Sequence, residues 1–173
     1  MRRAAAVHPI TALQTEWSLW ARGIESEILP VCQELNISVV PYSPLGRGAL
    51  TGTITSRDDL AENDHRRGMP WYSEENFERN MRTVTAVRGI AERHRATPGQ
   101  VALAWLLAKG PDVTPIPGTR RVAFMEENAA SAELALTPEE LATLDTLTVV
   151  GDREGASAMA ATNWFDGVTP PQR

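Results

Sequence analysis

The stretch PYSPLGRGALTG, residues 41–52, places an aromatic ring, a hydroxyl and a glycine-flanked arginine close together. Tyr42 offers a flat π face on which another ring can stack. The glycines on either side of Arg47 have no side chains, so a bound pyrophosphate can approach the backbone closely. Ser43 and Arg47 add a hydroxyl and a cation beside that backbone. This chemistry suits a phosphorylated aromatic ligand.

Two further segments carry groups that complement the first. Gln14 has a carboxamide, which can both donate to and accept from the carboxamide of a ligand. Arg120 and Arg121 precede a predicted helix, whose N-terminal dipole adds to their attraction for a phosphate monoester. Glu127 and Asn128 follow about two turns later and could bond an adenine edge. In chain order, these are the parts of a site for NADP: nicotinamide, pyrophosphate, 2′-phosphate and adenine.

Each of these features also has a structural explanation. A tyrosine at the end of a strand can pack in the core, and paired arginines often form a solvated surface. A glutamine in a strand can satisfy a backbone group. Residue types and spacing alone therefore leave both the NADP site and ordinary packing open.

The elements that must position these groups alternate between strands and helices. Strands are predicted at residues 10–17, 37–43 and 113–118, and each leads into a loop with candidate residues. Such alternation indicates parallel βαβ units, whose ligands lie at the carboxyl ends of the strands. The second strand is almost entirely apolar, which predicts that both of its faces are covered. Three parallel strands make an incomplete sheet.

Helical patterns account for most of the remaining chain. Ser73 is a predicted N-cap, and Thr97 precedes a proline at a first helical position. Thr137 and Glu140 are spaced as a capping box. The predicted helices cover residues 25–36, 74–94, 97–110, 120–134 and 137–147. The segment 44–72 is loop-like and too long for a simple connector.

Composition excludes several classes of function. The chain has 173 residues and a formal net charge of −5, which argues against nucleic acid as a partner. No apolar run reaches the length of a membrane helix, and no signal-peptide pattern opens the chain, so we expect a cytoplasmic protein without a membrane partner. Cys32 is the single cysteine and sits in an apolar helical pattern, so we predict a buried thiol.

Three segments carry a family resemblance: HPITALQTEWSLW, EILPVCQELNISVVPYSPLGRGALTG and PIPGTRRVAFMEENAASAELALTPEEL. They closely resemble the carboxyl-terminal half of aldo-keto reductases, which are NADP-dependent oxidoreductases built as (β/α)8 TIM barrels. The match runs from His8 to about residue 155. It implies an α/β fold, a partial barrel whose visible strands are barrel strands six, seven and eight, with phosphate bound after strands seven and eight.

The resemblance also implies a role for individual residues. Gln14 is expected to bind the nicotinamide carboxamide, and Tyr42 to stack on the nicotinamide ring. The pyrophosphate is expected along Ser43, Pro44, Leu45, Gly46 and Arg47. The 2′-phosphate is expected at Gly118, Thr119, Arg120 and Arg121, and the adenine at Glu127 and Asn128. Phe124 departs from the pattern, because many relatives carry a polar or basic side chain there.

The family reduces a carbonyl with an Asp, Tyr, Lys and His tetrad that lies upstream of the segments matched here. We therefore expect no catalytic residue and no metal site in this chain. Lys109, the single lysine, closes a predicted buried helix, and His65 and His94 are predicted to face solvent. Tyr72 could touch substrate, but it would lack a partner lysine to assist it as an acid.

Residues 1–173 are thus expected to form the carboxyl-terminal part of one barrel domain. Within it, residues 41–72 form the end of strand seven and a long cofactor and substrate loop, residues 114–133 the 2′-phosphate and adenine segment, and residues 149–173 an irregular tail. The first hypothesis is part of an NADP-dependent carbonyl reductase, which would take a small-molecule carbonyl substrate once completed. The alternatives are a non-catalytic NADP(H)-binding or interaction module and a fragment without independent function. Open barrel edges also predict self-association.

Overall fold

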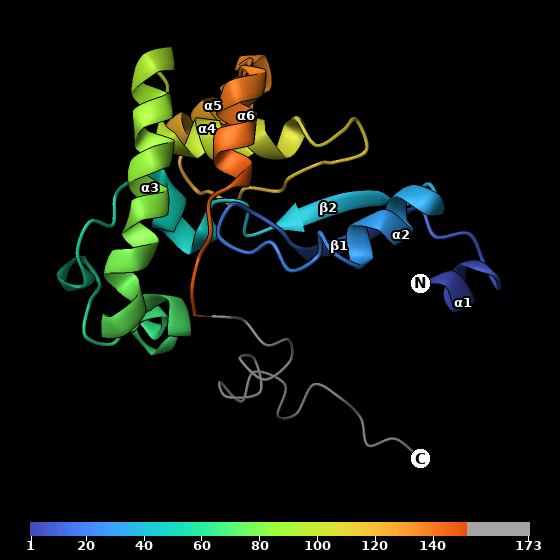
Figure 1. The fold of residues 1–173 in the computed structure, drawn as a ribbon, viewed down its shortest axis with the longest axis horizontal. Helices are drawn as coiled ribbons and strands as arrows, with labels where there is room; N and C mark the ends of the chain where they lie inside the picture. Colours follow the sequence, from blue (N-terminus) through green and yellow to red (C-terminus); the bar gives the residue numbers. More distant parts are fainter. Residues whose placement is uncertain (152–173) are drawn as a thin grey trace.

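In a computed structural model of the protein, which describes residues 1–151, two parallel strands lie at the centre of the fold. Strands β1 (Ala12–Glu16) and β2 (Ser38–Tyr42) pair in a register that sets Glu16 opposite Tyr42. Figure 1 shows them side by side, with α3, α4 and α6 toward one end and α1 and α2 toward the other. The predicted strands at 10–17 and 37–43 are confirmed, each slightly shorter.

The third predicted strand, residues 113–118, forms only an isolated parallel bridge between Val39 and Val113. The segment still runs along β2, because Thr114 N donates to the carbonyl of Val39 at 2.9 Å and Ile116 N to that of Pro41 at 3.0 Å. Pro41 has no N–H to donate in return, so the next bridge is missing one of its two bonds. The prediction of a regular strand was therefore wrong, while the parallel placement was right.

The two faces of this small sheet are covered unequally. Val39 and Val113 are buried in the hydrophobic core on one face. The opposite face carries Gln14, which is exposed, and Val40 and Tyr42, which are half-buried. The expectation that both faces of the second strand are covered is wrong, because Val40 and Tyr42 on this face are only half-buried. The uncovered face is the one that carries the predicted nicotinamide residues.

Six helices are described. They are α1 (Arg2–Ala5), α2 (Ile28–Glu34), α3 (Glu74–His94), α4 (Pro98–Leu107), α5 (Val122–Ala130) and α6 (Pro138–Asp145). The first predicted helix is shorter than expected because residues 23–27 form turns. The helix predicted over 120–134 ends at Ala130 and continues as a 3₁₀ turn, Ser131–Glu133. No helix among residues 1–151 is long and apolar enough to cross a membrane.

The predicted helix starts are confirmed by side-chain caps. The Ser73 hydroxyl accepts from Asn76 N, and both Thr97 and Thr137 form capping boxes. The helices bury the predicted stripes: α3 packs its apolar face inward, and α4 is buried over most of its length. Trp17 of the β1 end meets Trp105 of α4 edge to face, with ring centroids 6.0 Å apart. Cys32 is 1% exposed, as predicted.

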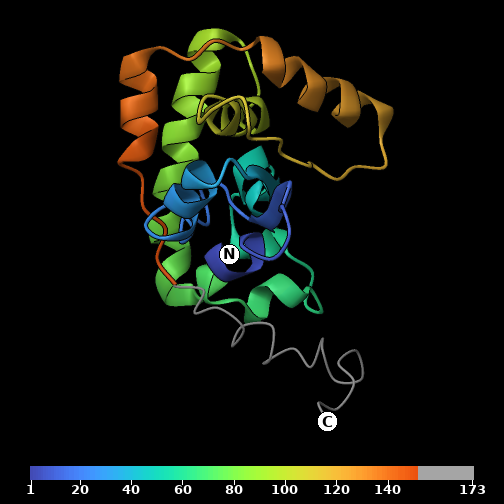
Figure 2. The same ribbon diagram turned by 90° about the vertical axis from the view of Figure 1, so that its right-hand side faces the viewer.

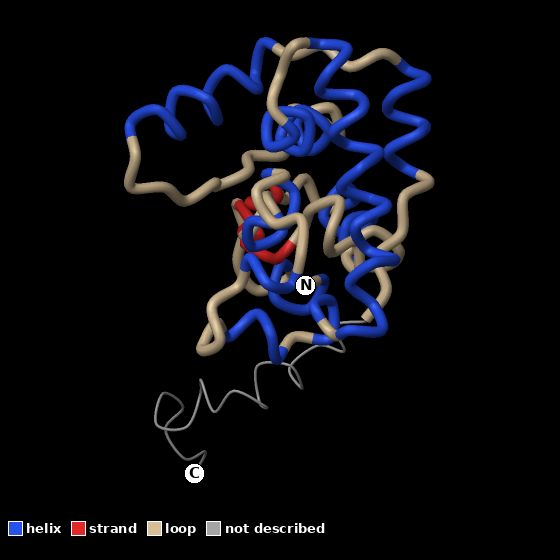
Figure 3. The backbone as a smooth tube through the Cα atoms, turned by 90° about the vertical axis from the view of Figure 1, so that its left-hand side faces the viewer, coloured by secondary structure: helices blue, strands red, loops and turns tan. Residues whose placement is uncertain are grey.

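Helix α5 sits apart from this core. Figure 2 shows it on the opposite side of α4 from α3 and α6. None of its residues is buried, and Val122 and Met125 are 67% and 59% exposed. The strands, drawn in red in Figure 3, lie near the middle of the molecule, away from α5.

The long loop is not a simple connector. It folds into four 3₁₀ turns: Gly46–Thr51, Arg57–Asp59, His65–Gly68 and Pro70–Tyr72. Tyr72 at its end is fully buried between Trp20 and Phe77. The predicted irregular tail, 149–173, falls mainly outside the described residues, and only its first three residues belong to them.

Candidate functional site

Gln14 and Tyr42 occupy the open face of the sheet. Gln14 pairs with Val40 in the ladder, two residues before Tyr42, which ends β2. Because side chains alternate along a strand, Gln14, Val40 and Tyr42 all point to the same side. A carboxamide and an aromatic ring are therefore presented together on one surface, as the sequence predicted for a nicotinamide.

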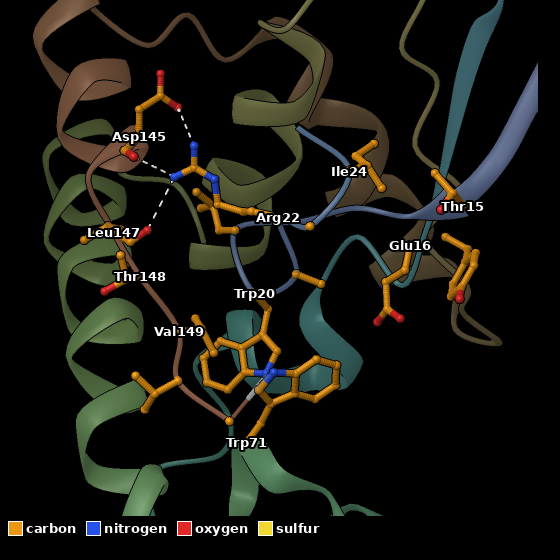
Figure 4. Close-up of a pocket in the computed structure, with 16 residues that line it drawn as sticks. Thr15, Glu16, Trp20, Arg22, Ile24, Trp71, Asp145, Leu147, Thr148 and Val149 are labelled. Carbon is orange, nitrogen blue, oxygen red and sulfur yellow. Dashed lines mark hydrogen bonds and ion pairs between the residues drawn. The ribbon is translucent and has the colours of Figure 1, made fainter. Parts of the chain in front are cut away.

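Tyr42 also borders a cavity with a volume of about 960 Å³. Trp20 and Trp71 line it, and Figure 4 shows Arg22 held by the carbonyls of Asp145 and Leu147. The cavity is lined by both polar and apolar groups, since Glu16 reaches it as well. It gives a small organic molecule room beside the Tyr42 ring.

Beyond Tyr42, the chain makes a left-handed turn. Ser43 has φ +50°, and Gly46, Arg47 and Gly48 follow with φ values of +58°, +54° and +97°. A left-handed conformation disfavours residues with a Cβ, so the two glycines are the natural residues here and Ser43 and Arg47 need support. Pro44 is buried and Leu45 is half-buried between these positions.

Gly46 is required by packing as well as by conformation. A Cβ at this position would lie 2.9 Å from Trp20 Cβ, closer than real side chains approach. The carbonyl of Gly46 accepts from the Tyr72 hydroxyl at 3.4 Å. Burial raises the pKa of Tyr72 to about 12. The reading of Tyr72 as a substrate contact is therefore wrong, because the side chain is inside the core and supports the turn.

The side chain of Arg47 reaches back to the end of β1. Its Nε lies 3.8 Å from Oε1 of Glu16, whose side chain is only 7% exposed. Glu16 stands on the same strand face as Gln14, two residues further on. The ion pair holds a cation at the junction of the strand end and the glycine turn, where the sequence predicted a pyrophosphate.

The predicted 2′-phosphate segment lies on the surface. Gly118, Thr119, Arg120 and Arg121 are all exposed. Arg121 N donates to the Thr119 hydroxyl at 3.1 Å, which fixes the backbone just before α5. The Arg121 guanidinium lies 5.2 Å from the centre of the Phe124 ring, a cation–π contact. Phe124 therefore contacts the guanidinium of this segment directly.

Glu127 links α5 to the start of α4. Its Oε1 accepts from the Thr97 hydroxyl at 2.7 Å, and its backbone carbonyl accepts from Gln100 at 3.1 Å. A Cβ built on Gly99 would lie 3.6 Å from both Glu127 Oε1 and Leu45 Cδ2. The glycine turn and the predicted adenine helix thus meet at the N-terminus of α4.

Asn128, the other predicted adenine residue, lines a second cavity of about 310 Å³. Thr119 lines the same cavity, together with residues of α4. One residue predicted for the 2′-phosphate, Thr119, and one predicted for the adenine, Asn128, therefore line the same cavity. The structure leaves Arg120 and Arg121 outside this cavity's lining.

Other titratable side chains have structural partners. Lys109 forms an ion pair with Asp145 and lies 4.5 Å from the centre of the Trp105 ring. His94 Nε2 lies 2.8 Å from Oε2 of Glu140, so the expectation that His94 faces solvent is wrong. Burial opposes ionisation of Glu140, but hydrogen bonds from His94, Thr137 N and Arg93 lower its pKa overall. His65 is exposed, as expected.

Sequence reasoning missed three residues of this region: Glu16, Asp64 and Arg66. Glu16 could have been found, because it follows Gln14 at the two-residue period of a strand face. Arg66 contacts the glycine turn from the far end of the loop, donating to the carbonyl of Arg47 at 2.9 Å, and Asp64 holds the Arg66 guanidinium in place. Nothing in local spacing indicates a contact across 19 residues.

Parallel strands, a buried helical layer and a cation-bearing glycine turn at a strand end define an α/β protein with a candidate ligand site at the strand ends. The sequence model of the Aldo/keto reductase family matches residues 1–148. The chain therefore belongs to the aldo/keto reductase family.

Two curated relatives are similar over most of the chain. A probable aldo-keto reductase of Glycine max is 40% identical over 175 residues, covering 99% of this chain and 50% of that protein. An aldo-keto reductase of Strobilurus tenacellus is 46% identical over 160 residues, covering 88% of this chain and 48% of that protein. The chain spans about half the length of the curated relatives it matches.

Solved structures agree with the fold. A glycerol dehydrogenase from Gluconobacter oxydans is 27% identical, with a TM-score of 0.75 over 82% of this chain and 43% of that one. An aldo-keto reductase from Klebsiella pneumoniae in complex with NADPH is also 27% identical, with a TM-score of 0.57 over 83% of this chain and 41% of that one. The α/β fold with its small parallel sheet is consistent with part of such a barrel.

Proposed function

We propose that this chain is the cofactor-binding part of an NADP-dependent aldo-keto reductase, with its strands corresponding to barrel strands six, seven and eight. The observation that carries the proposal is the shared open face of Gln14 and Tyr42, which continues into the left-handed turn at Gly46 and Arg47. A carboxamide partner, a stacking ring and a cation follow one another in the order of the NADP groups. The NADPH complex of the Klebsiella pneumoniae relative supports the choice of cofactor.

The residues present fit this group by their chemistry. Gln14 would pair with the nicotinamide carboxamide, and the Tyr42 ring would stack against the nicotinamide. Arg47 and the adjoining backbone would face the pyrophosphate, while Arg120 and Arg121 would bind the 2′-phosphate through charge-assisted hydrogen bonds. When bound, NADPH supplies a hydride to a carbonyl carbon. The residues of this chain bind and orient, and the cavity beside Tyr42 leaves room for a small carbonyl substrate.

Carbonyl reduction also requires an acid near the carbonyl oxygen. Among the described residues, Tyr72 is buried, Lys109 is paired with Asp145 and His94 with Glu140. These engagements favour binding without turnover by this chain alone. We propose that the proton donor of the complete reaction comes from a segment corresponding to the other half of the relatives' length.

The test is a titration of the full 173-residue chain with NADP⁺ and NAD⁺, followed by tryptophan fluorescence. We expect saturable binding that favours NADP⁺ and that weakens by up to about tenfold in Tyr42→Ala, since the lost ring stacking contributes about 0.5–1.5 kcal/mol. No NADPH-dependent reduction of nitrobenzaldehyde above background is expected. Absence of NADP⁺ binding by a folded chain would refute the proposed function, and turnover abolished by Tyr72→Phe would refute the assignment of Tyr72 to the core.

A further inference from the structure

Arg66 lies in the 3₁₀ turn His65–Gly68 and forms hydrogen bonds to two parts of the loop. Its Nη1 donates to the backbone carbonyl of Arg47 at 2.9 Å. Its Nε and Nη2 donate to the two carboxylate oxygens of Asp64 at 3.0 and 2.7 Å. Two nitrogens of the guanidinium therefore bind the Asp64 carboxylate as a fork, and the third reaches the glycine turn.

Asp64 is itself held in place. It is the N-cap of the same turn, and its Oδ1 accepts from Arg66 N at 2.9 Å. Hydrogen bonds from the side chain and the backbone of Arg66 lower the pKa of Asp64 to about 2. The side chains are only 16% and 24% exposed, so the pair stays charged and shielded near neutral pH.

The contact falls on a strained part of the turn. Arg47 has a left-handed backbone, with φ +54°, although it carries a Cβ. Holding the Arg47 carbonyl fixes the peptide plane between Arg47 and Gly48, because a peptide bond is planar. The Tyr72 hydroxyl fixes the preceding plane through the carbonyl of Gly46. A Cβ at Gly48 would lie 3.1 Å from Arg66 Nη1, so the guanidinium also packs directly on the turn.

In a trans peptide the N–H points away from the carbonyl of the same plane. With the Gly46 carbonyl tied to Tyr72, the N–H of Arg47 faces the opposite side of the turn. The Arg47 side chain leaves the turn toward Glu16 at the end of β1. Tyr72 thus sets the direction of the Arg47 N–H, while Arg66 holds the next peptide plane, whose Gly48 N–H donates to the carbonyl of Leu45 at 3.1 Å.

We propose that Arg66, braced by Asp64, is a positioning residue for the pyrophosphate of the cofactor: it holds the turn at residues 46–48 in its binding conformation without touching the ligand. This inference rests on the proposed function and assigns a pyrophosphate-specific role to a residue outside the predicted site. It implies that loss of Arg66 affects ligands with a pyrophosphate and spares those without one.

Arg67 supplies a matched control. Its Nε and Nη2 donate to the carbonyls of Arg57, Leu60 and Ala61, at distances between 2.7 and 3.1 Å. Arg67 therefore ties loop segments together with a similar number of bonds, and it is half-buried like Arg66. Its bonds go to residues 57–61 and not to the turn at 46–48.

The experiment measures dissociation constants of the full chain for NADP⁺ and for 2′-AMP, which has the adenine and the 2′-phosphate but no pyrophosphate. We expect Arg66→Ala to raise the constant for NADP⁺ at least about tenfold and to leave that for 2′-AMP within about twofold. Arg66→Lys should restore part of the loss, since Lys can donate to the Arg47 carbonyl but not form the fork. Arg67→Ala should lower the unfolding free energy while leaving both constants unchanged.

Three results would overturn the inference: an unchanged NADP⁺ constant in Arg66→Ala, an equal loss for both ligands, or the same pattern in Arg67→Ala. Where Arg66→Ala does not fold, Asp64→Asn loosens the fork with little change in shape and should give a smaller loss confined to NADP⁺. A folded wild-type chain that binds neither ligand would overturn the proposed function together with this inference. Wild-type binding with no Arg66 effect would overturn the inference alone.

Discussion

The Nε of Arg47 lies 3.8 Å from Oε1 of Glu16, joining the end of β1 to the glycine turn that follows β2. The Glu16 side chain is 7% exposed and that of Arg47 27%, so the pair is shielded from solvent on one side. Removing the cation from beside a buried carboxylate costs more than removing both charges. The pair therefore offers a direct test of how the turn is attached to the sheet.

We predict that Arg47→Met lowers the free energy of unfolding by on the order of 2 kcal/mol at neutral pH. Glu16→Gln in the same chain should recover part of that loss, with a coupling of about 1 kcal/mol in a double-mutant cycle. Urea unfolding of the four chains measures it. Strict additivity would mean that the two side chains do not interact.

Arg120 and Arg121 are predicted to read the 2′-phosphate. Replacing both with Ala should weaken NADP⁺ binding by about tenfold or more, because charge-assisted bonds to a phosphate contribute about 1.5–3 kcal/mol each. Binding of NAD⁺ should stay nearly unchanged. Parallel titrations with the two cofactors decide the matter, and equal losses would show that these arginines do not select the phosphate.

Gly46→Ala should be strongly destabilising. The new Cβ would lie 2.9 Å from Trp20 Cβ in a backbone with φ +58°, so both a clash and conformational strain arise, together worth about 2–4 kcal/mol. Gly118→Ala is the matched control, since nothing lies within 4 Å of a Cβ there. Thermal melts compare the two, and similar midpoints would contradict the packing seen at Trp20.

Tyr72→Phe should remove a high-pH titration. Burial raises the pKa of Tyr72 to about 12, above the value near 10 expected in the unfolded chain. The associated stability is thus present below pH 10 and is lost as the pH rises toward 12, because only the unfolded chain releases the proton. Phenolate absorbance of wild type and variant between pH 9 and 13 tests this; the chain has two tyrosines, so the assignment is simple.

The open sheet face predicts self-association. Ile116 is 44% exposed and, by its register beside β2, shares the face of Val40 and Tyr42. We expect the wild-type chain to sediment as more than a monomer and Ile116→Lys to shift it toward the monomer. Val122→Lys on α5 serves as the control, since Val122 is 67% exposed but lies away from the sheet. A monomeric wild-type chain would contradict the prediction.

Sequence patterns predicted elements best where local chemistry decides the structure. The caps at Ser73, Thr97 and Thr137 were predictable because each side chain bonds within its own first turn. The irregular pairing of residues 113–118 was not predictable from that segment, because it depends on Pro41 in the neighbouring strand. Whether a strand is covered on both faces likewise depends on what else packs there, which an apolar run does not reveal.

The same division holds for the candidate site. Gln14 and Tyr42 were predicted and do share a face, because the period of a strand fixes the direction of their side chains. The supporting contacts at Asp64, Arg66 and Tyr72 were missed or misread, because a loop of nearly 30 residues folds back by rules that no local pattern encodes. The binding roles of the individual residues remain predictions for the titrations above.

Pro41 gives the two ends of the site different stiffness. The predicted nicotinamide end lies on β1 and β2, which pair along their whole length. The predicted adenosine end follows residues 113–116, where Pro41 cannot donate one of the backbone hydrogen bonds to this segment. Local opening starts where backbone bonds are fewest, so the amide protons of Thr114 and Ile116 should exchange with solvent sooner than those at the centre of β2. A dinucleotide lying across this site would therefore be held by rigid backbone at its nicotinamide end and by backbone that opens more easily at its adenosine end.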